Sequence, residues 1–219
     1  MSKKVGVLLA GCGVFDGSEI HEAVLTLLAL DRAGAQIICA APNVEQMHVV
    51  NHLTQEVTDE KRNVLVESAR IARGEIRDVA ELRAVDIDAL IIPGGFGAAK
   101  NLSDFAVKGP EARVDSEVAR ILREMTDARK PVGALCIAPA TLTRALADLA
   151  PEVTIGSDEA TASAIEAMGG RHRICSVDMV CIDHEHRIVT TPAYMLGPGI
   201  KDVAKGIEKL VNQIVDMIS

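Results

Sequence analysis

Residues 131–149 read PVGALCIAPATLTRALADL, and this stretch indicates the fold class by itself. Its first five residues form a short apolar run of the length typical of a buried strand, and residues 139–149 follow the spacing of a helix. Cys136 stands between the two. A strand that passes directly into a helix is the repeating unit of a parallel sheet covered by helices. The stretch therefore predicts an α/β fold with a cysteine at the end of one strand.

The same alternation continues over the whole chain. Further apolar runs of strand length lie at residues 5–10, 36–40 and 88–92. Helical patterns begin near Glu19 and end at Gly34, and recur at residues 64–73, 111–128, 159–168 and 200–218. Residues 176–182 and 187–191 alternate like a late β-hairpin, whereas residues 42–63 are polar and irregular and indicate a loop or the edge of a small subdomain. We expect a single domain over residues 1–219, with a mostly parallel sheet and helices on both faces.

Composition excludes several classes of function. Aromatic residues make up 2% of the 219 residues, too few for the stacking surfaces that bind single-stranded nucleic acid. A formal net charge of −8 repels both phosphate backbones and anionic lipids. No segment resembles a membrane span or a cleaved signal peptide, so neither nucleic acid nor membrane is an expected partner and a cytoplasmic location is predicted. The five cysteines form no CxxC pair, which argues against a disulfide framework or a metal site.

Cys136 is the best candidate for a reactive group. Ala134 and Ala138, two residues to either side, leave room for the tight turn of a nucleophile elbow. The following helix begins here, and its N-terminus is expected to lower the pKa of the thiol. Backbone N–H groups of Ile137 and of Gly95, in the Gly-rich turn at residues 93–97, are candidate donors to an oxyanion. The alternative is that Cys136 is a small buried hydrophobic residue.

Other polar residues sit near the ends of the predicted strands, where ligands bind in open α/β sheets. Glu19 opens the first helix, so its carboxyl group is expected to reach the crevice that holds Cys136. The alternative is that this carboxylate only stabilises the helix N-terminus. His21 is a weaker acid–base candidate, and Cys12 is a possible resolving thiol. His184-Glu185-His186 falls at the predicted hairpin tip and reads as a solvated turn.

A dinucleotide cofactor is not expected. The segment at residues 11–16, GCGVFD, begins like a dinucleotide fingerprint but lacks its third glycine. The second predicted strand ends in Ala40-Ala41-Pro42, without the acid that binds a ribose. A nicotinamide cofactor is therefore disfavoured.

Five blocks of sequence resemble a known family. They are GCGV at 11–14, DGSEIHE at 16–22, PGGFGAAKNL at 93–102, CIAP at 136–139 and TTPAYM at 190–195. In this order they closely resemble the ElbB-like isoprenoid-biosynthesis-associated proteins with an amidotransferase-like domain, in the PfpI-like branch of the class I glutamine amidotransferase-like superfamily. The resemblance covers essentially the whole chain.

The resemblance implies a flavodoxin-like three-layer sandwich and a homodimer. It implies a cofactor-free glyoxalase that converts glyoxal to glycolate, with a possible deglycase activity on glyoxal adducts. Cys136 would be the nucleophile and Glu19 its hydrogen-bonded partner. Many members of the superfamily have a histidine directly after the cysteine, where this chain has Ile137, and no histidine occurs at residues 154–158, where several relatives have another. A Cys-His-Glu hydrolase or glutaminase triad is therefore not expected.

A second interpretation belongs to a different class. The same fold and thiol would suit a non-catalytic or redox-sensing dimer that modulates a partner in a stress or isoprenoid pathway. Oxidation distinguishes the two, since a sensor forms a stable sulfenate at Cys136 or a disulfide between Cys12 and Cys136.

Overall fold

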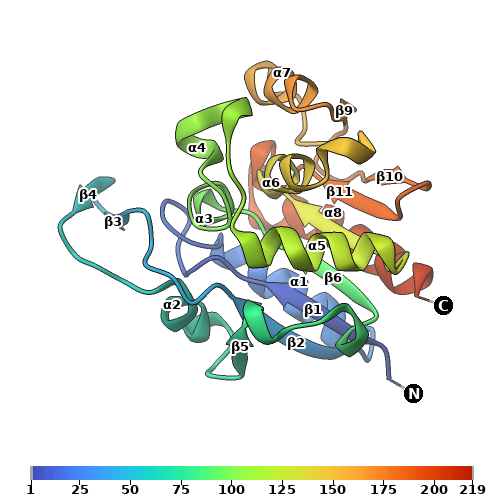
Figure 1. Ribbon diagram of the computed structural model, residues 1–219, viewed down its shortest axis with the longest axis horizontal. Helices are drawn as coiled ribbons and strands as arrows, with labels where there is room; N and C mark the ends of the chain where they lie inside the picture. Colours follow the sequence, from blue (N-terminus) through green and yellow to red (C-terminus); the bar gives the residue numbers. More distant parts are fainter. Residues whose placement is uncertain (1, 219) are drawn as a thin grey trace.

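The computed structural model describes residues 2–218 and is built around one seven-stranded sheet (Figure 1). The strand order is β10-β11-β7-β6-β1-β2-β5, and all neighbours are parallel except β10 and β11. The strands of this sheet are β1 (Lys4–Leu8), β2 (Gln36–Ala41), β5 (Ile76–Asp78), β6 (Ala89–Ile92), β7 (Val132–Leu135), β10 (Cys181–Asp183) and β11 (Ile188–Thr191).

Helices cover both faces of the sheet. Helices α1, α2 and α8 contribute side chains to the hydrophobic cluster on one face, and α3 to α7 contribute to the cluster on the other. The helices are α1 (Ile20–Arg32), α2 (Val64–Ile71), α3 (Phe96–Lys100), α4 (Phe105–Lys108), α5 (Ser116–Asp127), α6 (Ala138–Ala145), α7 (Glu159–Ala167) and α8 (Ile200–Met217). This three-layer arrangement confirms the predicted flavodoxin-like fold.

The apolar strands explain why both faces are covered. In β6, Ala89 and Ile91 point into one cluster, while Leu90 and Ile92 point into the other. Successive side chains of a strand lie on opposite faces, so an unbroken apolar run requires packing partners on both sides. All four residues are completely buried.

The late hairpin is confirmed, with Cys181 opposite Thr190 in an antiparallel pair. Its first strand is shorter than predicted and begins at Cys181. The long helix predicted from residue 111 begins at Ser116, because the carboxylate of Asp115 accepts hydrogen bonds from the next turn and caps the helix there.

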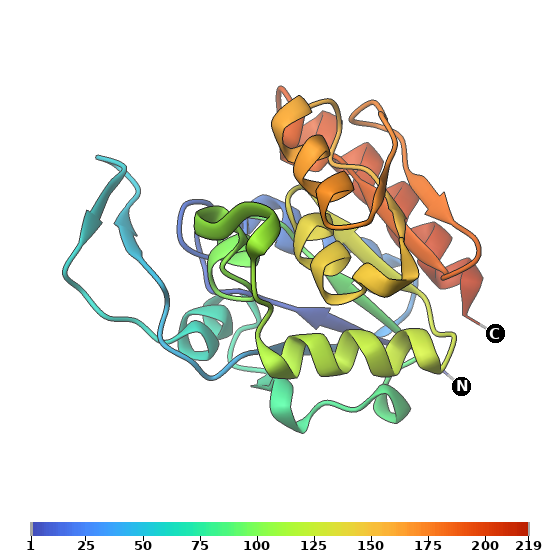
Figure 2. The same cartoon turned by 45° about the horizontal axis from the view of Figure 1, so that its top comes forward.

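The segment at residues 42–63 contains a second hairpin that the sequence did not reveal. Strands β3 (Val49–Asn51) and β4 (Glu56–Thr58) project from the body of the protein in both views (Figures 1 and 2). The Asp16 carboxylate accepts a 2.7 Å hydrogen bond from the amide of Val50 and so holds the base of the hairpin. Three-residue strands are too short to show a clear alternation, which is why the pattern read as a loop. Two further two-residue strands, β8 (Glu152–Val153) and β9 (Arg171–His172), pair separately.

Candidate active site

Cys136 occupies a strained turn between β7 and α6. Its backbone is left-handed, with φ at 57°, a conformation that costs a non-glycine residue about 1–2 kcal/mol and persists only where its surroundings enforce it. Its amide donates to the carbonyl oxygen of Thr191 on β11 at 3.0 Å. Ala134 and Ala138 are fully buried around the turn. The structure therefore has the sharp strand-to-helix turn that the sequence predicts.

The acid that contacts the thiol is Glu22, in the first turn of α1. Its side chain is fully buried and hydrogen-bonds Cys136. One carboxyl oxygen accepts from the amide of Gly94 at 2.9 Å, and the other accepts from the amide of Tyr194 at 3.0 Å. Three loops that follow β6, β7 and β11 thus meet on one carboxyl group.

Burial governs the proton affinity of this pair. The pKa of Glu22 is raised to about 7, first by desolvation and to a smaller extent by the charge of nearby Glu19, while the two backbone amides and the Cys136 hydrogen bond oppose the shift. The pKa of the Cys136 thiol is raised well above its usual value, first by burial and then by the charge of Glu22. Two adjacent buried acids share protons as a unit, so the pair retains a proton at neutral pH.

The predicted lowering of the thiol pKa by the helix is therefore wrong for the resting protein. Backbone N–H groups of Gly95 and Ile137 do donate to the sulfur and do favour the thiolate. Their effect is smaller than that of desolvation and of the Glu22 charge, because Cys136 is only 7% exposed. These are the two amides that the sequence analysis named as candidate donors to an oxyanion.

Gly94 lies against both acids, and no larger residue fits there. A Cβ atom added there would collide with the Cβ atom of Cys136 and would come within 2.6 Å of a Glu22 carboxyl oxygen. Gly95, at φ 92°, has the left-handed backbone that glycine tolerates. The Gly-rich turn thus allows β6 to approach the elbow closely.

Glu19 lies at the site but does not make the hydrogen bond expected of it. Its carboxyl group caps α1 by accepting from the amide of Glu22 at 2.7 Å. The expected carboxyl partner of Cys136 is thus corrected from Glu19 to Glu22. Glu19 occupies the N-cap position, so its side chain folds back over the helix end, while Glu22 points one turn deeper toward the sheet. The second oxygen of Glu19 lies 4.0 Å from Nδ1 of His21.

A cavity of about 400 Å³ opens onto Cys136. Apolar side chains form most of its wall, and the carboxyl groups of Glu19 and Asp158 add negative charge. The lining residues are Val14, Glu19, Gly95, Phe96, Cys136, Ile137, Asp158, Thr161, Tyr194 and Met195. All four residues that the sequence assigned to the site, Cys136, Glu19, Gly95 and Ile137, line this one cavity.

Tyr194 joins the site from a short 3₁₀ turn, Ala193–Met195, after β11. Its backbone amide binds Glu22, as described above, and its hydroxyl group lies 2.8 Å from Nδ1 of His21. Neither Tyr194 nor Glu22 was singled out from the sequence. The spacing of three residues between Glu19 and Glu22 on one helix was the available signal, since it places both carboxyl groups on the same side of α1.

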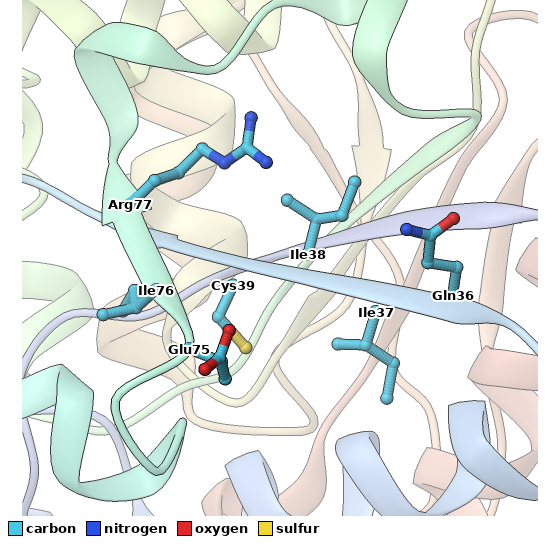
Figure 3. Close-up of a pocket in the computed structure, with 7 residues that line it drawn as sticks. All are labelled: Gln36, Ile37, Ile38, Cys39, Glu75, Ile76 and Arg77. Carbon is cyan, nitrogen blue, oxygen red and sulfur yellow. The ribbon is translucent and has the colours of Figure 1, made fainter.

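The remaining cysteines lie elsewhere. Cys39, on β2, borders a separate pocket of about 390 Å³ at the β2–β5 edge of the sheet, together with Glu75 and Arg77 (Figure 3). Burial raises its pKa to about 11, and burial first of all raises the pKa of Cys181 to about 12. Cys12 is half-buried, and burial also raises its pKa. Within residues 2–218 all five thiols are free.

The two histidines of the late hairpin, His184 and His186, lie in different surroundings. His184 is exposed in the turn. Nδ1 of His186 lies 3.0 Å from the buried carboxylate of Asp183, so His186 holds the turn together. Over residues 2–218 no cluster of three His, Cys, Asp or Glu side chains has a metal-binding arrangement. In the same range, none of the helices combines the length and hydropathy needed to cross a bilayer.

Fold and site together define a class: flavodoxin-like α/β proteins with a nucleophile-elbow cysteine beside a buried glutamate. The chain belongs to the DJ-1/PfpI family, which residues 7–154 match. This family includes glyoxalases and deglycases, and enzymes with a cysteine nucleophile occur in its superfamily.

Relatives support the assignment over nearly the full chain. The mitochondrial ES1 protein homolog of Rattus norvegicus is 43% identical over 98% of this chain and 84% of its own length. The mitochondrial glutamine amidotransferase-like class 1 domain-containing protein 3 of Homo sapiens is 44% identical over 98% of this chain and 83% of its own length. A crystal structure of an isoprenoid biosynthesis protein with an amidotransferase-like domain from Ehrlichia chaffeensis is 42% identical, with a TM-score of 0.91 over 97% of this chain and 99% of that one.

The family predicted from the five sequence blocks is thus confirmed. The predicted cytoplasmic location is contradicted, because the rat and human relatives are both named as mitochondrial proteins. That prediction rested on the lack of a recognisable targeting pattern near the first residues, and such a lack does not specify a compartment.

Proposed function

We propose that this protein is a cofactor-independent glyoxalase that converts glyoxal to glycolate through a hemithioacetal on Cys136. The observation that carries the proposal is the Cys136 thiol, which lines a cavity with a largely apolar wall and hydrogen-bonds the buried acid Glu22. The reaction is an internal redox conversion in which one carbon of glyoxal is oxidised and the other is reduced. With water as the second reactant it therefore balances without an external oxidant.

The first step forms the carbon–sulfur bond. Glu22 takes the thiol proton of Cys136, and the sulfur attacks one aldehyde carbon. The carbonyl oxygen becomes an alkoxide that the amides of Gly95 and Ile137 are placed to receive, since both already point at the sulfur. Protonation of the alkoxide by Glu22 completes the hemithioacetal and returns Glu22 to its carboxylate form.

The second step moves a proton between the two carbons. Glu19, which lines the cavity, takes the C–H proton of the hemithioacetal carbon, and the electron pair forms an enediolate that becomes an enediol when its charged oxygen gains a proton. Return of a proton to the neighbouring carbon, with loss of the hydroxyl proton on the sulfur-bearing carbon, gives a glycolyl thioester on Cys136. Attack by water then breaks the carbon–sulfur bond, releases glycolate and restores the thiol.

The experiment is a comparison of glycolate formation from glyoxal, with a metal chelator present, by the wild-type protein, Cys136→Ala, Glu22→Gln and Glu19→Gln. Cys39→Ala, on β2, and Glu124→Gln, on α5, are matched controls at residues that do not line the cavity. We expect turnover by the wild type and both controls, none by Cys136→Ala, and losses of about 100-fold or more in the two glutamate variants. Full turnover by Cys136→Ala would refute the proposal. Absence of turnover by the wild type would favour a redox-sensing role, for which peroxide should give a stable sulfenate at Cys136.

We extend the proposal to early adducts of glyoxal with amines. The Cys136 sulfur would bond to the adduct carbon as the carbon–nitrogen bond breaks and the amine leaves. A preformed hemiaminal of glyoxal with acetylated arginine, used in place of free glyoxal, tests this deglycase activity. Faster glycolate formation than spontaneous adduct breakdown allows would support it. A rate limited by breakdown would restrict the activity to free glyoxal.

We also propose that the protein works as a homodimer. Helix α1 exposes Ile20, Val24 and Leu28, at 43%, 48% and 40%, on one face at a spacing of four residues. Isolated exposed hydrophobic residues are common, but a row of three on one helix is typical of an interface. Sedimentation should show a dimer that Val24→Glu dissociates and that Val85→Glu, at a more exposed valine outside α1, leaves intact.

A further inference from the structure

The proposed reaction needs an acid in addition to the groups assigned above. When the C–H proton leaves the hemithioacetal, the oxygen on the neighbouring carbon gains negative charge and requires a proton. Glu19 is then occupied by the proton it has just taken, and Glu22, which is fully buried and does not line the cavity, has already given its proton to the alkoxide of the first step. No histidine lines the cavity. The remaining titratable side chains in its wall are Asp158 and Tyr194.

We propose that Tyr194 is the catalytic acid that protonates this oxygen, and that His21 is a positioning residue that orients and reprotonates the phenol. The inference rests on the proposed glyoxalase function and assigns a new role within it. Asp158 is unsuited to the task, because its carboxylate caps α7 by accepting from the amide of Thr161 at 2.8 Å, which lowers its pKa. It is therefore ionised and has no proton to give.

The geometry connects the phenol to solvent through the histidine. Nδ1 of His21 lies 2.8 Å from the Tyr194 hydroxyl oxygen, and the two rings are tilted with centroids 5.8 Å apart. The His21 side chain is 53% exposed, so its ring can exchange protons with water while Nδ1 faces the phenol. When Nδ1–H donates to the phenol oxygen, the phenol O–H is free to donate to a substrate in the cavity.

The surroundings keep the phenol protonated. Burial, with the charges of Glu19 and Glu22, raises the pKa of Tyr194 above its usual value. Tyr194 also donates its backbone N–H to Glu22, the residue that takes the proton of the Cys136 thiol. The loop that holds Glu22 therefore also fixes the position of the phenol relative to Cys136. Ala193, with φ at 45°, is held in a left-handed turn directly before Tyr194.

The proton inventory balances over the cycle. Tyr194 gives its proton to the oxygen as the enediol forms, and His21 returns a proton to the phenolate. Glu19 then delivers its proton to the neighbouring carbon, and the enediol hydroxyl on the sulfur-bearing carbon gives its proton to the Tyr194 oxygen as the thioester carbonyl forms, while the phenol returns a proton to His21. Each side chain ends in its starting state.

The test begins with Tyr194→Phe, which removes only the hydroxyl group and keeps the ring and the backbone N–H to Glu22. We expect kcat for glyoxal to fall by about 100-fold or more with little change in KM. The rate of Cys136 alkylation by iodoacetamide should stay within about twofold of wild type, since the thiol and its base are untouched. His21→Asn should lower kcat by a smaller factor, whereas His184→Asn, at the exposed hairpin turn, should have no effect.

A double-mutant cycle separates a shared role from two structural ones. If His21 acts through Tyr194, adding His21→Asn to Tyr194→Phe lowers kcat no further. Independent, multiplicative losses would overturn the positioning role of His21. Wild-type kcat in Tyr194→Phe, alongside an inactive Cys136→Ala, would overturn the catalytic role of Tyr194 while leaving the proposed function intact. An inactive wild-type protein would instead refute the proposed function itself.

Discussion

The carboxyl group of Glu22 and the thiol of Cys136 form one buried acid pair, held by backbone N–H groups from three different loops. Amides of Gly94 and Tyr194 bind the carboxyl group, and amides of Gly95 and Ile137 bind the sulfur. These donors are fixed by the ends of the parallel strands, so the pair is preorganised before any substrate arrives. Predictions about stability as well as activity follow from this arrangement.

Glu22→Gln should change how stability depends on pH. The pKa of Glu22 rises from 4.5 to about 7 on folding, so the folded state binds more protons than the unfolded state between these values. The free energy of unfolding of the wild type therefore falls as pH rises through this window, by about 3 kcal/mol from this group. Glutamine does not titrate, so the free energy of unfolding of the variant does not fall in this pH window. One unmatched N–H group lowers that free energy by the same amount at every pH.

Denaturant unfolding of both proteins at pH 4.5 and pH 8 measures the effect. The variant should gain about 3 kcal/mol relative to wild type at the higher pH. Parallel pH curves for the two proteins would show that Glu22 is not a buried, proton-binding carboxyl group.

Cys136→Gly should be at least as stable as Cys136→Ala. Alanine keeps the strain of the left-handed backbone at φ 57°, whereas glycine is free of it. At Ala164, within α7, the same change from alanine to glycine should cost about 1 kcal/mol. Thermal unfolding of the three variants measures the contrast. A clear loss of stability on replacing alanine by glycine at position 136 would argue against the strained elbow.

Gly94→Ala should damage the site and the fold together. The new methyl group must displace Cys136 or Glu22, at a cost of about 1–3 kcal/mol or more. Gly199→Ala is the matched control, because a Cβ atom there meets nothing within 4 Å and φ is −173°. It should cost less than about 1 kcal/mol. Equal stabilities of the two variants would contradict the close approach of the Gly-rich turn.

Asp16→Asn should loosen the projecting β3–β4 hairpin. The carboxylate is 3% exposed and accepts from the Val50 amide, so its loss leaves a poorer acceptor at a buried donor. A decrease of about 1–3 kcal/mol in protection of the Val50 amide is expected by hydrogen exchange. Asp59→Asn, at an exposed position beyond β4, should leave that protection unchanged. An unchanged Val50 amide in the first variant would show that the hairpin is held by other contacts.

The sequence predicts the sheet core well, since β1, β2, β6 and β7 are unbroken apolar runs whose burial on both faces leaves one architecture. The elbow at Cys136 is likewise predicted from Ala134 and Ala138. The short strands β3 and β4 were missed, because three residues show no reliable period.

The choice of carboxyl partner could not be made from sequence. Glu19 and Glu22 both lie on the same side of the start of α1, and only the helix cap decides which one points inward. The raised pKa of the thiol was missed for a related reason: a helix N-terminus is visible in the sequence, whereas the depth of burial and the neighbouring Glu22 are properties of the folded chain.

The central claim is that Cys136 carries the conversion of glyoxal to glycolate, and the most direct measurement is the initial rate of glycolate formation by wild type and by Cys136→Ala, in the presence of a chelator. The account predicts steady turnover by the wild type and none above the uncatalysed rate by the variant. Equal rates in the two proteins would contradict it.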